Sequence, residues 1–163
     1  MRKNLFFCTI ILLVFSFLSC ASMIKLKDPI VIKNGDLSSF QYVIVNDTET
    51  SISGSGAGYN GIYSSHTKTV TPKEIIIGYL AKNGFVILNS IDLKKTDKTL
   101  IVNYGESGRR EIFGGYTTEI TIQFLNYETS EIIATTTTEG VGSTEVDDIK
   151  IAINRALTAL FEN

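Results

Sequence analysis

The chain begins with a short basic stretch, which contains Arg2 and Lys3, and continues with an apolar run from Leu5 to Leu18. The run is about 14 residues long, whereas a helix that crosses the hydrocarbon core of a bilayer needs about 20. A basic flank followed by an apolar run of this length is typical of a secretory signal peptide. Residues 1–19 are therefore predicted to be removed, and only the rest of the chain enters the prediction of the fold.

The residues at the end of the apolar run, Phe17-Leu18-Ser19-Cys20-Ala21, resemble the lipobox of bacterial lipoproteins, with Phe17 where Leu is commoner. The resemblance implies cleavage before Cys20 and acylation of the Cys20 thiol, with palmitate as a typical acyl group. The alternative is ordinary signal cleavage nearby, which would leave Cys20 as a free thiol. Because Cys8 lies in the leader, Cys20 is the single cysteine of the mature chain, and a thiol blocked by lipid suits an oxidising compartment.

Two positions after the cysteine bear on where the anchor is expected to lie. Ala21 is not the Asp that retains lipoproteins in the inner membrane of many bacteria, which favours the outer membrane. The first acidic residue after Cys20 is Asp28, so the acidic cluster that resembles a surface-export signal is missing, which favours the periplasmic face. Residues 20–29 are predicted to be the lipidated cysteine and a short tether, which reaches about 30 Å at most and keeps the domain close to its membrane.

The composition of the mature chain fits one domain, predicted over residues 30–163. The 144 residues from Cys20 onward include 13 basic and 17 acidic residues, a net charge of −4. That length can bury a core without disulfides or metal. The sequence lacks the basic stripe that nucleic-acid binding needs, so a nucleic-acid partner is not expected.

The elements expected in the first half are short strands and one well-marked helix. Apolar and β-branched residues predict strands at 29–32 and 40–45, and the Ser- and Gly-rich segment 48–70 is predicted to be a long loop. Thr71-Pro72-Lys73-Glu74 is a capping box with proline at the first helical position, and Gly84 suits a left-handed C-cap. A helix is therefore predicted over 72–83.

The second half is predicted to contain strands at 85–88, 100–104, 117–127 and 131–139, with the last two forming an antiparallel hairpin. Residues 105–115 are expected to be a flexible hairpin connection. The final helix is expected to open at Ser143 or Thr144, with Asp147 completing a second capping box. The order β-α-β-β-β-β-α predicts an α+β fold, an antiparallel sheet of about four to five strands with two helices packed on one face.

Motifs with catalytic or metal-binding meaning are weak, so no catalytic residue, metal or cofactor is predicted. Residues 56–61 match G-x-G-x-x-G, but neither a strand directly before them nor a helix directly after them is expected. His66 is the single histidine and lies in the same loop, without a nucleophile motif elsewhere. The paired acids Asp147 and Asp148 open a helix, where the macrodipole favours them structurally.

Candidate binding residues are the aromatic and basic side chains that glycine-rich segments present: Tyr59, Tyr63, Arg109, Arg110 and Tyr116. Large amphipathic rings on glycine supports can anchor a partner or stack on a sugar, or can fold back over an open sheet. Arginines at a hairpin tip are most often solvated and otherwise face a carboxylate or phosphate. These alternatives stay open at the level of the sequence.

Several segments together resemble a group of small lipoproteins common in Bacteroidales, in which a periplasm-facing α+β domain follows a lipoprotein signal peptide. They are 79–85, 100–106, 115–119 and 152–157. The resemblance covers most of the mature chain and implies a location and an architecture, without a known activity. The expected function is therefore a non-enzymatic, membrane-tethered lipoprotein that binds a nearby envelope partner. The alternatives are binding of a small glycan or lipid by the Gly/Tyr loops, and a hydrolase that uses Glu106 and Glu111.

Overall fold

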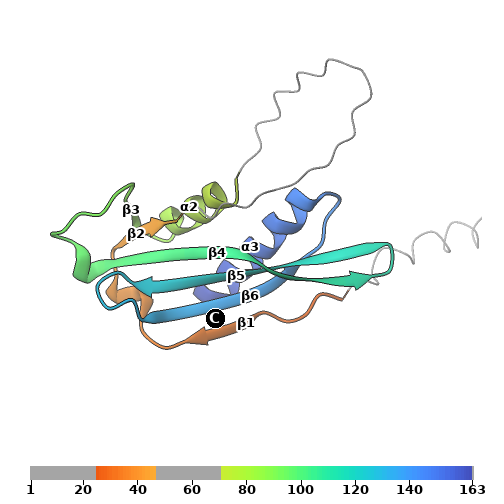
Figure 1. Cartoon of the computed structure of the whole chain (residues 1–163), viewed down its shortest axis with the longest axis horizontal. Helices are drawn as coiled ribbons and strands as arrows, with labels where there is room; N and C mark the ends of the chain where they lie inside the picture. Colours follow the sequence, from red (N-terminus) through yellow and green to blue (C-terminus); the bar gives the residue numbers. More distant parts are fainter. Residues whose placement is uncertain (1–24, 47–70, 163) are drawn as a thin grey trace, which may run out of the picture.

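The computed structural model describes residues 25–46 and 71–162 and contains one mixed sheet with two helices on one face (Figure 1). The sheet order is β1-β6-β5-β4-β2-β3. Two α-helices and six strands form the framework of the described chain: β1 (Ile30–Lys33), β2 (Tyr42–Val45), α2 (Pro72–Lys82), β3 (Val86–Ile87), β4 (Thr99–Ile112), β5 (Gly115–Asn126), β6 (Ile132–Gly140) and α3 (Glu145–Phe161).

The α+β class is confirmed, whereas the antiparallel sheet of four to five strands is wrong. The sheet has six strands, and β2 pairs in parallel with both β3 and β4. The physical reason is the helix α2 between β2 and β3, because a helical crossover returns the chain to the end of the sheet where the first strand began. The strands from β4 to β6 and the edge strand β1 pair antiparallel.

The helix α2 begins and ends where its capping residues predict. The Thr71 side chain accepts a hydrogen bond from the Glu74 amide at 3.3 Å, and the Glu74 carboxylate accepts one from the Thr71 amide at 2.8 Å. Gly84, just after the helix, has a φ of +89°, which a residue with a side chain rarely adopts. The predicted capping box and glycine stop are both confirmed.

The helix α3 packs directly on β5 and β6 and is the main cover of the sheet. Ala152 and Ala156 are fully buried, and their carbonyls accept hydrogen bonds from Thr138 (2.6 Å) and Thr136 (3.3 Å) of β6. A Cβ placed on Gly140 would lie 1.9 Å from the Asp148 carbonyl oxygen, so only glycine allows this approach of helix to strand. Apolar side chains make up most of the core between helices and sheet, with Val43, Leu80, Leu100, Ile122, Phe124 and Leu157 fully buried.

The hairpin of β4 and β5 is longer than the sequence suggests and extends past β2 and β3 at one end of the sheet (Figure 1). The predicted flexible connection over 105–115 is wrong, because β4 continues to Ile112 and pairs with β5 up to a two-residue turn. A bulge between Glu106 and Gly108 shifts the register, and it hides the alternation that would have marked the strand. Gly114 supplies the positive φ of +88° in the turn.

Replacing Thr118 by Val is expected to raise the free energy of unfolding by about 1 kcal/mol. The Thr118 hydroxyl is buried on the helix side of β5 and has no hydrogen-bond partner among the described residues, so its desolvation is uncompensated. Thr138→Val is the matched control: it removes the bond to the Ala152 carbonyl and should lower the free energy by about 1 kcal/mol. Urea unfolding of both variants would contradict this account if the two changes had the same sign.

Candidate functional site

The hairpin end of the sheet places two predicted binding residues on opposite faces. Arg109 pairs with Thr118 in the register, and Arg110 pairs with Thr117. The bulge before Gly108 inserts one residue and exchanges the faces to which the following side chains point. As a result, Arg109 lies on the side of α3, and Arg110 lies on the open face of the sheet.

The Arg110 guanidinium forms a bidentate pair with the carboxylate of Glu139 on β6. Its Nε and Nη2 donate to the two carboxylate oxygens at 2.8 and 2.6 Å. The Glu139 carboxylate also accepts from the Lys27 amide at 3.1 Å and lies 3.4 Å from the Lys27 Nζ. The side chain of Glu139 is 2% exposed, and the bonds from Arg110, followed by those from Lys27, outweigh the effect of burial and lower its pKa to about 2.

The same cluster holds the segment that precedes β1. The Lys25 carbonyl accepts a hydrogen bond from Arg110 at 3.3 Å, and the Lys27 carbonyl accepts one from Arg155 of α3 at 2.8 Å. Arg155 also donates to the Glu139 carbonyl. Residues 25–27 lie within the segment predicted to be a tether, and hydrogen bonds fix them against the hairpin, β6 and α3. We call the set of Lys25, Lys27, Arg110, Glu139 and Arg155 the tether clamp.

Arg109 forms a second, more exposed cluster on the helix side of the hairpin. Its guanidinium donates to Glu106 at 2.5 and 3.1 Å and to Glu145, in the first turn of α3, at 2.5 Å. It also lies over the ring of Tyr116, 4.8 Å from the centroid. The bonds to Glu106 and then Glu145 raise the pKa of Arg109, and Arg109 in turn lowers the pKa of Glu106. A lowered pKa is the opposite of what a general acid requires.

A hollow of about 280 Å³ lies between the hairpin tip and the start of α3, lined by residues 112–116, 141–145 and Asp148. Asp148 is buried and accepts a hydrogen bond from the Gly142 amide. Asp147 accepts bonds from the hydroxyls of Ser143 (2.7 Å) and Thr144 (2.9 Å). Both acids therefore hold the start of the helix, and Thr144 is the N-cap, accepting from the Asp147 amide at 3.2 Å. The predicted second capping box is formed only in part, because the Asp147 carboxylate accepts from the Thr144 hydroxyl in place of the Thr144 amide.

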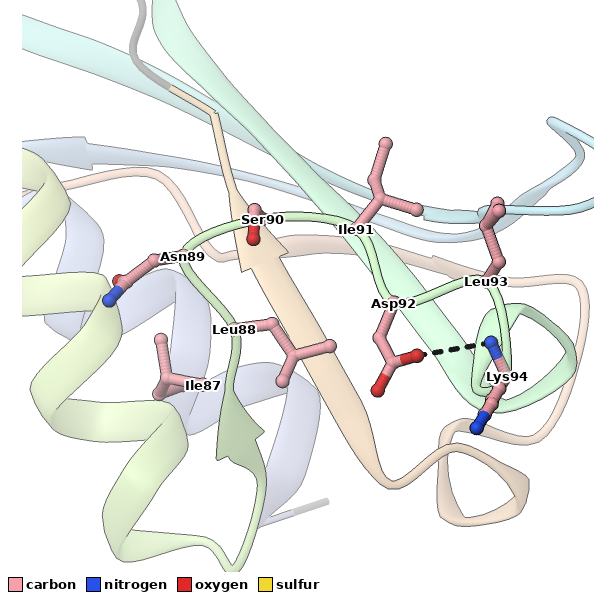
Figure 2. A pocket seen from close by; sticks show the side chains of 8 residues that line it. All are labelled: Ile87, Leu88, Asn89, Ser90, Ile91, Asp92, Leu93 and Lys94. Carbon is pink, nitrogen blue, oxygen red and sulfur yellow. Dashed lines mark hydrogen bonds between the residues drawn. The ribbon is translucent and has the colours of Figure 1, made fainter.

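A second hollow, of about 710 Å³, lies at the other end of the sheet along residues 87–94, which comprise the end of β3 and the first part of its connection to β4 and are called the loop 87–94 below. Figure 2 shows that Ile91 and Leu93 project from one side of this loop, away from Leu88 and Asp92. Ile91 is 51% exposed and Leu93 is 82% exposed. Asp92 fixes the turn by accepting from the Lys94 amide at 3.1 Å and pairing with Lys95 at 3.1 Å. The loop therefore presents two apolar side chains on a hydrogen-bonded turn.

The structure brings together only part of the predicted set of binding residues. Arg109 and Tyr116 are in contact, whereas Arg110 faces Glu139 on the other side of the sheet. Both arginines pair with carboxylates of the same chain, Arg109 with Glu106 and Glu145 and Arg110 with Glu139. Cys20, Tyr59, Tyr63, His66 and the glycine motif at 56–61 lie outside the described residues.

Sequence reasoning missed the tether clamp, although Glu139 carried a usable signal. It lies at the end of a strand that is rich in threonine. A carboxylate buried in such a strand is costly unless a charged group pairs with it. Over residues 25–46 and 71–162, no group of His, Cys, Asp or Glu side chains is arranged to hold a metal ion. None of the helices in the described ranges is long and apolar enough to cross a membrane.

Comparisons with known proteins give a distant structural likeness. No family model matches the chain, and no curated protein matches it. The chain is similar to the PelC dodecamer from Paraburkholderia phytofirmans, with a TM-score of 0.48 and 16% identity over 82% of this chain and 98% of that one. A dodecamer of a single-substitution variant of that PelC gives a TM-score of 0.48 and 15% identity over 80% of this chain and 93% of that one.

Glu139→Gln is expected to lower the free energy of unfolding at neutral pH by about 2 kcal/mol, because it removes the charge from a buried, multiply bonded carboxylate. The native pKa of Glu139 is lowered from 4.5 to about 2. Its contribution is therefore present above pH 4.5 and is lost as the pH falls toward 2. The difference between wild type and Glu139→Gln should shrink across that window in urea unfolding.

The matched control is Glu106→Gln, which removes a carboxylate that is also paired with an arginine but is 34% exposed. Solvent screening limits its effect to about 1 kcal/mol or less. Parallel pH profiles for wild type and Glu139→Gln, or an equal effect of the two substitutions, would contradict the role of burial in the tether clamp.

Proposed function

We propose that this protein is a membrane-tethered, non-enzymatic lipoprotein of the cell envelope, anchored through Cys20 to the periplasmic face of the outer membrane, that binds a nearby envelope protein. The resemblance of residues 17–21 to a lipobox supports the anchor. The observation that carries the proposal further is the tether clamp, because it fixes Lys25, five residues after Cys20, against the hairpin.

The tether clamp defines which end of the domain would face the membrane. Five residues span at most about 18 Å whatever path they take, so the lipid anchor must lie within that reach of Lys25. Lys25 contacts Arg110, which is two residues from the end of β4. The hairpin end of the sheet is therefore the membrane-proximal end.

The opposite end is left for a partner. Arg110 and Thr99 are separated by most of β4, which corresponds to about 35 Å along an extended strand. The loop 87–94 precedes Thr99 and exposes Ile91 and Leu93 at that end. Exposed apolar side chains on an ordered turn are suitable for a protein contact. We assign the partner-binding surface to this loop.

Cys20→Ala is expected to move the protein from the outer-membrane fraction to the soluble periplasmic fraction, because a single stable attachment is removed. Intact mass should show acyl chains on the wild type and none on the variant. A wild-type protein that is unacylated, or a variant that has lost its leader and still stays in the outer-membrane fraction, would contradict the anchor. Matching thermal unfolding of the two proteins would show that the domain itself is unaffected.

A photoreactive amino acid at position 93 is expected to crosslink the acylated protein in intact cells to one recurrent envelope protein. The same amino acid in place of Glu111, which is exposed at the hairpin end, is the matched control and should not capture that protein. Leu93→Ser should reduce recovery of the captured protein without lowering stability, since the side chain is 82% exposed. Equal capture from both ends would contradict the assignment to the loop 87–94.

A further inference from the structure

We propose that the tip of the β4–β5 hairpin inserts the Phe113 side chain into the surface of the lipid bilayer. The inference rests on the proposed function, because it requires the anchor at Cys20. It goes further by assigning a second, non-covalent contact with the membrane to a specific side chain of the folded domain.

Phe113 is fully exposed, with a relative accessibility of 102%, and is the most exposed large apolar side chain among the described residues. It occupies the two-residue turn with Gly114, and the last residue of β4, Ile112, is paired with the first residue of β5, Gly115, directly behind it. The strands thus fix the backbone on both sides of the ring. A protruding ring on a paired hairpin can enter an apolar phase with little further ordering of the chain.

The position of Phe113 relative to the anchor favours lipid as the group that contacts the exposed ring. Phe113 is three residues beyond Arg110, and Arg110 holds the Lys25 carbonyl at 3.3 Å. Three residues of strand span about 10 Å, and the five residue steps from Cys20 to Lys25 span at most about 18 Å. The anchor therefore keeps the tip within reach of the membrane surface. Leu93, which is also exposed, lies at the other end of β4 and is too far from the anchor for this contact.

The side chains around the tip suit the boundary between lipid and water. Tyr116 is 39% exposed beside the turn, and tyrosine is enriched at membrane interfaces. Glu106 and Glu145 are paired with Arg109. Other exposed charged side chains near this end are of both signs, with Lys25, Lys27 and Lys150 against Asp28 and Glu111. With no strong excess of either sign, the attraction proposed here is apolar burial of Phe113.

Tryptophan fluorescence can test the contact directly, because the chain contains no tryptophan. The full chain would be expressed with Phe113→Trp or with the control Leu93→Trp, purified in its acylated form and reconstituted into vesicles of phosphatidylethanolamine and phosphatidylglycerol. The Phe113→Trp protein should show blue-shifted emission on vesicle binding and quenching by brominated acyl chains. The Leu93→Trp protein should show neither change. Both positions are exposed, so neither substitution disturbs the core.

Several outcomes would overturn the inference, and vesicle flotation with intact mass identifies which premise failed. An acylated protein that floats with vesicles but whose Phe113→Trp emission is unquenched contradicts insertion and leaves the anchor intact. Equal quenching at positions 113 and 93 contradicts the orientation. Shielding of position 113 in native membranes but not in pure lipid vesicles indicates a protein occupant instead. A protein that is not acylated and does not float removes the anchor, and with it this inference.

Discussion

The buried carboxylate of Glu139 joins three parts of the chain that are distant in sequence. A charge removed from water is costly unless it is paired and fully hydrogen-bonded, and Arg110 and Lys27 supply those bonds from the hairpin and from the segment before β1. Arg155 adds α3 to the same cluster. The arrangement depends on the bulge before Gly108, because regular pairing of the same residues beyond Glu106 would place Arg109, and not Arg110, opposite Thr117 on the face of Glu139.

Elements with a strong local signal could be predicted from sequence, and pairing between distant elements could not. The capping box at Thr71 and the Thr144 cap depend on residues three apart, so both helices began close to where they were expected. The parallel pairing of β2 was missed, although a helix between two strands is its usual sign. The second half of β4 was missed because glycines and a bulge interrupt the alternation there.

The candidate site was only partly accessible to sequence analysis for the same reason. Residue type and neighbouring glycines were enough to select Arg109, Arg110 and Tyr116 as candidates. Of these, Arg109 and Tyr116 are in contact. Consecutive residues of a strand point to opposite faces, and the bulge before Gly108 decides which of the two arginines lies on which face, which no composition reveals. The partnership of Lys27 with Glu139 spans 112 positions, and contacts of such separation are fixed by the tertiary fold and carry no local pattern.

The tether clamp has a consequence for how a membrane-bound domain would search for its partner. A lipoprotein on a long, loose tether explores a wide hemisphere, and its effective concentration at any one height is low. Here Lys25 is held against the hairpin, so a domain anchored at Cys20 would move along the membrane plane at a nearly constant height. A partner whose binding surface lies at the same distance from the membrane as the loop 87–94 would then encounter the loop at high local concentration. A partner whose surface lies closer to the membrane or further from it would rarely encounter the loop.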